Sequence, residues 1–192
     1  MIPRHTYDAV RREALSLIDR AHLPLTEAER GRIVAADFGL GDVRREGIEV
    51  LTLFETGRVA AKILVLLPHQ TEPEHWHPRV GDDPGKEETV RAVWGDLYFY
   101  VPDDFDVGRD ADPPTEGVEK GFVVEGKEAS YTLRREVDLR PGHQLTFPPM
   151  TPHWFQAGPR GAVMFSFSTP VRDGLDGFRD PGVVRETVVG GE

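Results

Sequence analysis

The sequence predicts an all-β jelly-roll barrel preceded by a pair of α-helices. Apolar residues in the segment 7–21 recur at spacings of three and four, which places them on one face of a helix. From residue 47 onward, apolar residues fall in short runs separated by glycine, proline and aspartate, as in strands joined by turns. Several short strands at this spacing indicate a sandwich or a small barrel, and a jelly roll closes most strand edges around a cavity.

The two helices are expected within the first 46 residues. The second begins at Thr26, because Thr26-Glu27-Ala28-Glu29 has the capping-box form, in which a glutamate side chain binds the N–H of the cap residue. This helix should end near Gly39 and Gly41. We therefore expect residues 1–46 to form a helical extension packed on the barrel, and residues 47–192 to form the barrel within one structural unit.

Seven strands are expected in the barrel. The runs that predict them are 48–54, 59–67, 90–101, 118–124, 131–137, 144–147 and 162–168. The acidic, proline-rich segment 103–117 interrupts this series, and we expect it to be an exposed loop.

Composition limits the classes of function. The chain has 192 residues, of which 39% are hydrophobic and 29% charged, as in one folded domain. It contains no cysteine, which excludes disulfides, thiolate zinc sites, iron–sulfur clusters and thiol nucleophiles. A bound metal would therefore be held by histidine and carboxylate. The net charge of −10 repels nucleic acid and anionic membranes, so we expect a small neutral molecule as the partner.

The expected location is the cytoplasm. The first eight residues lack the apolar stretch of a secretory signal. The longest apolar run, 63–67, is far shorter than the roughly 20 residues that cross a bilayer.

The pentapeptide Glu74-His75-Trp76-His77-Pro78 is the most informative segment. In an extended chain His75 and His77 point to the same face about 6.6 Å apart, because side chains alternate and each residue rises about 3.3 Å. Two imidazoles so placed can bind one cation, although a surface loop could carry the same pair. Glu88 and His153, each placed just before an expected strand, would complete a set of three histidines and one glutamate.

These residues make the sequence resemble the cupin superfamily, whose motifs read H-x-H…E and P-x-x-x-x-H. The matching residues are His75, His77, Lys86, Glu88 and Gly95, then Pro141, Gly142, Pro148 and His153. More narrowly, the sequence looks like the D-lyxose isomerases between about Leu66 and Glu186. That resemblance is carried by the segments 70–78, 86–89, 148–155, 165–169 and Val171-Arg172-Asp173.

The resemblance implies a metal-dependent aldose–ketose isomerase. It would interconvert D-lyxose and D-xylulose, and also D-mannose and D-fructose, by proton transfer through a metal-bound cis-enediolate. The implied ligands are His75, His77, Glu88 and His153. Imidazole and carboxylate suit Mn²⁺, Zn²⁺, Co²⁺ or Fe²⁺, and the family implies manganese. A homodimer is also expected.

The resemblance nominates Lys86 as the general base. Lys86 lies two residues before Glu88, and a neighbouring dication would lower its pKa. The alternative is that Lys86 is a solvent-exposed lysine in a loop. The second acid or base is not assigned, because the segment 164–168 lacks the glutamate that the better-known branch of the family has there. Glu74, Glu87 and Asp173 are the candidates.

Candidate substrate-binding residues come from two patterns. Aromatic rings can pack on the C–H surface of a sugar, although ordinary core packing gives the same sequence pattern. Lys62 lies between apolar residues in an expected strand, which is unusual enough to suggest a pocket. The candidates are Lys62, Glu74, Tyr98, Trp154 and Asp173.

Some alternatives stay open. His69 is a rival ligand or a group that orients one, and His143 is expected to serve a turn. A cupin dioxygenase would use the same ligands with Fe²⁺ and O₂. A non-catalytic sugar- or metal-binding cupin would need no second acid or base.

Overall fold

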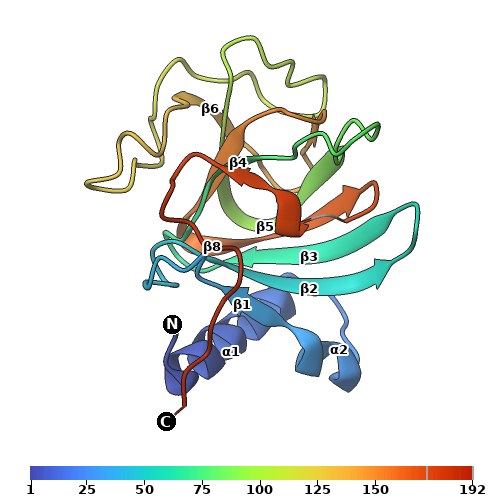
Figure 1. The fold of residues 1–192 in the computed structure, drawn as a ribbon, viewed down its shortest axis with the longest axis vertical. Helices are drawn as coiled ribbons and strands as arrows, with labels where there is room; N and C mark the ends of the chain where they lie inside the picture. Colours follow the sequence, from blue (N-terminus) through green and yellow to red (C-terminus); the bar gives the residue numbers. More distant parts are fainter. Residues whose placement is uncertain (172, 192) are drawn as a thin grey trace.

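The strands form one sheet that curls on itself, with the helices on its outer side (Figure 1). The computed structural model describes residues 1–171 and 173–191. In chain order the elements are α1 (Arg4–Arg20), α2 (Glu27–Arg32), β1 (Val34–Ala36), β2 (Ile48–Glu55), β3 (Ala60–Leu66), β4 (Thr71–Trp76), β5 (Glu88–Val101), β6 (Arg135–Asp138), β7 (Gln144–Phe147), β8 (His153–Ser168), the 3₁₀ turn η1 (Asp173–Leu175) and β9 (Gly177–Phe178). The strand order is β1-β2-β3-β8-β4-β9, and β5 pairs with β6, β7 and β8.

Strand β3 is buried on both faces, which explains its nearly continuous apolar sequence. Ile63 and Val65 belong to a core cluster that includes the apolar face of α1. Leu64 and Leu66 belong to a second cluster on the concave side of the sheet. The helix therefore covers the outside of the sheet, and the concave side is free to surround a cavity.

Strand β8 is the centre of the sheet. Its second half pairs with β3, its first half pairs with β4, and β5 pairs with it over nearly its whole length. The register of β5 against β8 shifts on both sides of Gly95, where φ is +90°. A Cβ atom at Gly95 would lie 2.0 Å from the carbonyl oxygen of Gly161. Bulges and glycines of this kind bend a sheet, so this crossing contributes to the curl.

Both expected helices form, but the second is shorter than predicted. Thr26 caps α2 through the expected capping box with Glu29. The helix ends at Arg32 rather than near Gly39 or Gly41, because Ile33 is extended and residues 34–36 pair with β2 as β1. The proposed boundary between residues 46 and 47 stays a prediction.

Four of the expected strands correspond to β2, β3, β5 and β7. The segment 118–124 is not a strand, because side chains satisfy its backbone N–H groups. The carboxylate of Glu136 accepts from the N–H groups of Glu119, Lys120 and Gly121 at 3.1 Å, and the Gln156 side chain accepts from that of Phe122 at 2.9 Å. Of the segment 131–137, only the last residues enter a strand, β6.

Two further boundaries differ from the prediction. Strand β8 begins at His153 rather than at residue 162, since the turn-like sequence 158–161 lies inside the strand. Residues 71–76 form β4, which brings the histidine pair to the end of a strand. The segment 103–117 contains no helix or strand, as expected for a loop.

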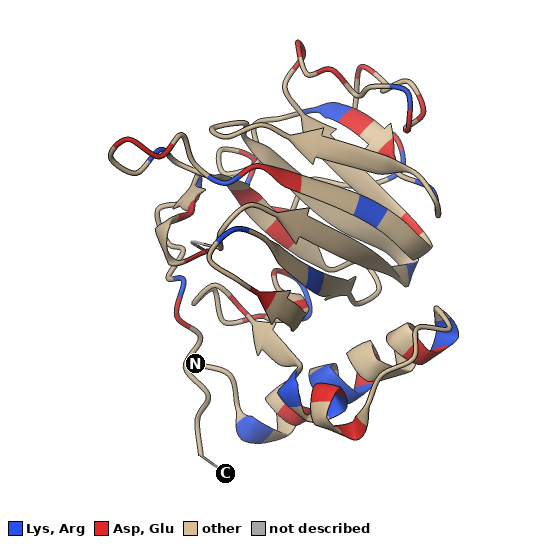
Figure 2. Cartoon of the chain, turned by 90° about the vertical axis from the view of Figure 1, so that its right-hand side faces the viewer, with Lys and Arg blue, Asp and Glu red and all other residues tan. Residues whose placement is uncertain are grey.

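Charges of both signs are mixed along the helices and strands (Figure 2). Within the described residues, no helix is long and apolar enough to span a bilayer. The expectation of no nucleic-acid or membrane partner stays a prediction.

We expect Gly95→Ala to lower the free energy of unfolding by about 2–5 kcal/mol, because a Cβ there combines a strained φ with backbone overlap. Gly57→Ala is the matched control, since a Cβ at Gly57 meets nothing within 4 Å. Urea denaturation of both variants measures the difference. Equal midpoints would show that the crossing tolerates a side chain.

Candidate metal centre

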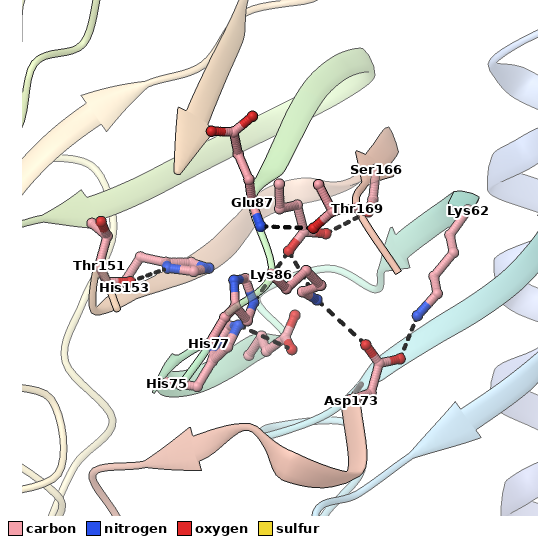
Figure 3. A network of polar contacts seen from close by, with 12 residues as sticks. Lys62, His75, His77, Lys86, Glu87, Thr151, His153, Ser166, Thr169 and Asp173 are labelled. Carbon is pink, nitrogen blue, oxygen red and sulfur yellow. Dashed lines mark hydrogen bonds and ion pairs between the residues drawn. The ribbon is translucent and has the colours of Figure 1, made fainter. Parts of the chain in front are cut away.

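Three histidines meet on the concave side of the sheet. His75 is the last residue of β4 that pairs with β8, His77 follows two residues later, and His153 begins β8 directly opposite His75 in the ladder. One ring nitrogen from each of the three lies within 4.8 Å of the others, and all three side chains are buried. Figure 3 shows the three rings side by side.

Backbone carbonyls orient two of these rings. Nδ1 of His75 lies 2.9 Å from the carbonyl oxygen of Pro73, and Nδ1 of His153 lies 3.0 Å from that of Thr151. A carbonyl oxygen only accepts, so each Nδ1 donates and each Nε2 keeps its lone pair. Such contacts fix the tautomer of histidines that bind metals.

His77 gives a second indication of a missing partner. Both of its ring nitrogens are buried without a hydrogen bond to any described residue. Nε2 lies 3.3 Å from Oε2 of Glu88, but the two atoms are not oriented to form a hydrogen bond. A buried polar atom with no partner is costly, and a cation bound among the three rings would satisfy it.

The environment keeps all three imidazoles neutral. Burial lowers the pKa of His77 to about 3 and that of His153 to about 4, and it lowers that of His75 well below its usual value. Only the neutral ring can bind a metal.

Glu88 supplies a carboxylate beside the three rings. Its Oε2 atom lies 3.2 Å from Nζ of Lys86, and its Oε1 atom accepts a hydrogen bond from the Ser166 hydroxyl. Burial alone would raise the pKa of Glu88, but Lys86 and His77 outweigh burial and lower it to about 2. Three neutral imidazoles and one carboxylate are the donor set of a borderline divalent cation, so the residues fit the expected metal.

Lys86 joins this centre to a group of ion pairs. Its Nζ lies 3.3 Å from Oδ1 of Asp173, whose other oxygen pairs with Lys62 and lies 3.5 Å from Nη2 of Arg185 (Figure 3 shows the first two contacts). Burial alone would raise the pKa of Asp173, but these cations hold it below the usual range. Asp173 is therefore a charged carboxylate that three cations share.

The side chains around Lys86 act against the expected lowering of its pKa. Burial lowers that pKa, but the carboxylates of Glu88, Asp173 and Asp176 outweigh burial and raise it. The sequence-based expectation took account of a neighbouring dication but not of the charges of these three carboxylates.

The residues around a small cavity show which candidates the fold brings together. The cavity, about 40 Å³ in volume, is lined by Ile48, Val50, Lys62, Leu64, Glu72, His75, Lys86, Glu88, Val90, His153, Phe155, Asp173, Asp176 and Arg185. Val50, Lys62, Asp173 and Arg185 also line a wider neighbouring cavity of about 400 Å³. Lys62 and Asp173 thus line both cavities and stand between them, and their role in substrate binding stays a prediction.

Three predicted substrate-binding residues lie elsewhere. Glu74 is fully buried, and its carboxylate accepts hydrogen bonds from Thr132, Leu133 and Arg179. Tyr98 and Trp154 pack in a separate core cluster with Tyr100, Val124 and Tyr131. The prediction is wrong for these three, because alternation points Glu74 away from His75 and the aromatic rings fill a core.

Other candidates are also outside the cavity. Glu87 is exposed, and Figure 3 shows its carboxylate directed away from Lys86. His69 is exposed, and neither His69 nor His143 belongs to the group of three histidines. Arg172, part of the motif that carried the resemblance, lies outside the described residues.

The sequence analysis missed two acids of the cavity wall, Glu72 and Asp176. Strict alternation would place Glu72 on the face opposite His75, but the register of β4 against β8 shifts between them, and Pro73 lies in the irregular stretch. Burial raises the pKa of Glu72 to about 8 and that of Asp176 to about 7. A proline between two acidic residues, just before the histidine pair, was the available signal.

The fold and the site together define a mostly-β protein with a buried three-histidine centre on the concave side of a curled sheet. No family model matches the sequence. A D-lyxose ketol-isomerase from Cohnella laeviribosi is 45% identical over 170 residues, which are 88% of each chain. A D-lyxose/D-mannose isomerase from Thermosediminibacter oceani is 38% identical over 185 residues, or 96% of this chain and 97% of the relative. The chain belongs to the D-lyxose ketol-isomerase family, which confirms the resemblance seen in the sequence.

Solved structures confirm the fold. L-ribose isomerase from Acinetobacter sp. DL28 superposes with a TM-score of 0.74 at 18% identity, and L-ribose isomerase from Cellulomonas parahominis with 0.74 at 20% identity. Each comparison covers 98% of both chains.

We expect His77→Ala to weaken Mn²⁺ binding by at least about tenfold, because it removes one imidazole from the group of three. His5→Ala removes an exposed histidine of α1 and is the control. Calorimetric titration with Mn²⁺ and elemental analysis after dialysis measure the effect. Equal metal binding in the two variants would place the ion elsewhere.

Proposed function

We propose that the protein is a metal-dependent aldose–ketose isomerase that interconverts D-lyxose and D-xylulose, and D-mannose and D-fructose. The observation that carries this proposal is the buried group of three histidines, flanked by Glu88 and Lys86, in a chain that belongs to the D-lyxose ketol-isomerase family. The dioxygenase and non-catalytic alternatives have no comparable support from relatives.

His75, His77, His153 and Glu88 would hold the cation, and Mn²⁺ is the ion we propose. When bound, such an ion supplies positive charge that stabilises an enediolate as it develops. The two backbone carbonyls behind His75 and His153 hold the rings in place for this role, and Ser166 orients Glu88.

Lys86 is the residue placed to move the proton. The neighbouring acids favour the ammonium form of Lys86, and the positive charge of a cation bound by the histidines would oppose them. In the neutral form Nζ accepts the proton from C2 of the aldose and returns it to C1, so no net proton is gained or lost. Glu88 and Asp173, both in contact with this amine, keep it directed into the cavity.

The charges of the cavity suit a neutral sugar. Each of the lining cations Lys62, Lys86 and Arg185 contacts Asp173, so in the described part of the wall none is left for a phosphate group. A sugar that reaches the histidines from the wider cavity passes these ion-paired side chains.

We also propose the fold family, the cellular location and the oligomeric state of the protein. The curled sheet with its two N-terminal helices is proposed to be a cupin jelly roll. The protein is proposed to act in the cytoplasm as a homodimer. Size-exclusion chromatography with light scattering tests the oligomeric state.

We expect the Mn²⁺-loaded protein to convert D-lyxose to D-xylulose, and removal of the metal by a chelator to abolish the conversion. In D₂O, deuterium should enter the product at the carbon that receives the proton, as measured by NMR. Activity in protein verified as free of metal, or oxygen uptake in place of isomerisation, would contradict the proposal.

Lys86→Arg is expected to lower kcat by about 10²–10⁴, because arginine keeps the positive charge between Glu88 and Asp173 but does not deprotonate. Metal content should not change. Lys120→Arg, which alters an exposed lysine paired with Asp138, is the control. Unchanged turnover in Lys86→Arg would assign Lys86 a structural role.

A further inference from the structure

The charged groups of the cavity wall fall into two sets. Lys62, Lys86 and Arg185 each pair with Asp173, and Glu88 contacts Lys86, His77 and Ser166. Glu72 and Asp176 differ, because neither carboxyl group has a hydrogen bond from any described residue. The wall therefore holds two carboxyl groups that accept no hydrogen bond from residues 1–171 or 173–191.

Glu72 is the more confined of these two groups. Its side chain is 11% exposed, and its Oε1 atom lies 3.9 Å from Nε2 of His75. Glu72 pairs with Phe155 in the β4–β8 ladder, two residues along β8 from His153, which pairs with His75. The carboxyl group therefore lies in the cavity beside the metal-facing nitrogens, but outside the cluster that they form.

We propose that Glu72 binds a hydroxyl group of the sugar and positions the sugar chain beside the three histidines. This inference rests on the proposed function and names the residue that recognises its substrate class. A buried carboxyl group without a partner is costly, and a polyol is the ligand that relieves that cost. A hydroxyl both donates and accepts, so it can bind this group in either protonation state.

The chain offers a matched control. Glu49 is a completely buried carboxyl group in β2, and one of its oxygens has no hydrogen-bond partner among the described residues. It bonds to Gln70 and does not line the cavity. Glu49→Gln therefore removes a buried acid outside the cavity, whereas Glu72→Gln removes one from the cavity wall.

The test is the binding of D-arabinitol, the pentitol that reduction of D-lyxose gives, to the Mn²⁺-loaded protein by calorimetry. We expect Glu72→Gln to weaken D-arabinitol binding and to raise KM for D-lyxose by at least about fivefold, because the carboxamide offers one acceptor oxygen where the carboxyl group offers two. Mn²⁺ content should stay equal to that of the unchanged protein. Glu49→Gln should bind D-arabinitol within twofold of the unchanged protein.

Three results would overturn the inference. They are binding by Glu72→Gln within twofold of the unchanged protein, loss of Mn²⁺ from this variant, and an equal loss of binding in Glu49→Gln. If Glu72→Gln does not fold, Glu72→Asp keeps the acid one carbon further from the cavity and should weaken binding at least about fivefold. An unchanged protein that binds D-arabinitol but does not isomerise D-lyxose would contradict the proposed function and leave the role of Glu72 testable.

Discussion

The antiparallel pairing of β4 with β8 is the constraint on which the site depends. It places His75 opposite His153, although 78 positions separate them in sequence (153 − 75 = 78). The N–H of Met150 donates to the carbonyl of His77 at 3.0 Å, which ties the loop before β8 to the third histidine. The long pairing of β8 with β5 then brings Glu88 to the same region, opposite Ser168 and bonded to Ser166.

Electrostatics gives this buried region its order. Isolated buried charges are costly, so each must be paired or neutral. The histidines are neutral, and Lys86 is shared between Glu88 and Asp173. Asp173 in turn contacts Lys62 and Arg185, which line both cavities. Lys86, the proposed proton-transfer group, is therefore connected through Asp173 to the wall between the two cavities. A substitution of Lys62 or Arg185 would therefore alter the charge around Asp173 and, through it, around Lys86.

The sequence predicted what local patterns encode. The capping box at Thr26, the alternating strands and the histidine pair depend on neighbours within a few residues, and these predictions agree with the structure. The end of the second helix was wrong because tertiary pairing with β2 overrides a local helical pattern. Glu72 was missed because a bulge breaks the alternation from which its direction would be deduced.

Aromatic residues show the limit of composition as a guide to a sugar site. Trp154 stacks on Tyr100 with ring centroids 3.5 Å apart and donates its indole N–H to the carbonyl of Leu133. A satisfied, fully buried ring of this kind has no free face for a ligand. The cavity is instead lined by one aromatic ring, that of Phe155, together with the histidines, aliphatic residues and charged side chains, and a sequence does not distinguish these from ordinary core and surface positions.

The last part of the chain completes the cavity and also returns to the beginning of the chain. Arg185 lines the cavity wall. The residues that follow it pair with the start of the chain: the N–H of Ile2 donates to the carbonyl of Val188, and the N–H of Gly190 donates to the carbonyl of Ile2, both at 2.8 Å (Figure 1 shows the two ends together). Neighbouring ends of this kind favour circular permutation. A permuted chain, in which a linker joins the two ends and new ends lie in the loop 103–117, would keep Asp173 and Arg185 in the wall. The pairing of Ile2 with Val188 and Gly190 would then be held by a continuous chain.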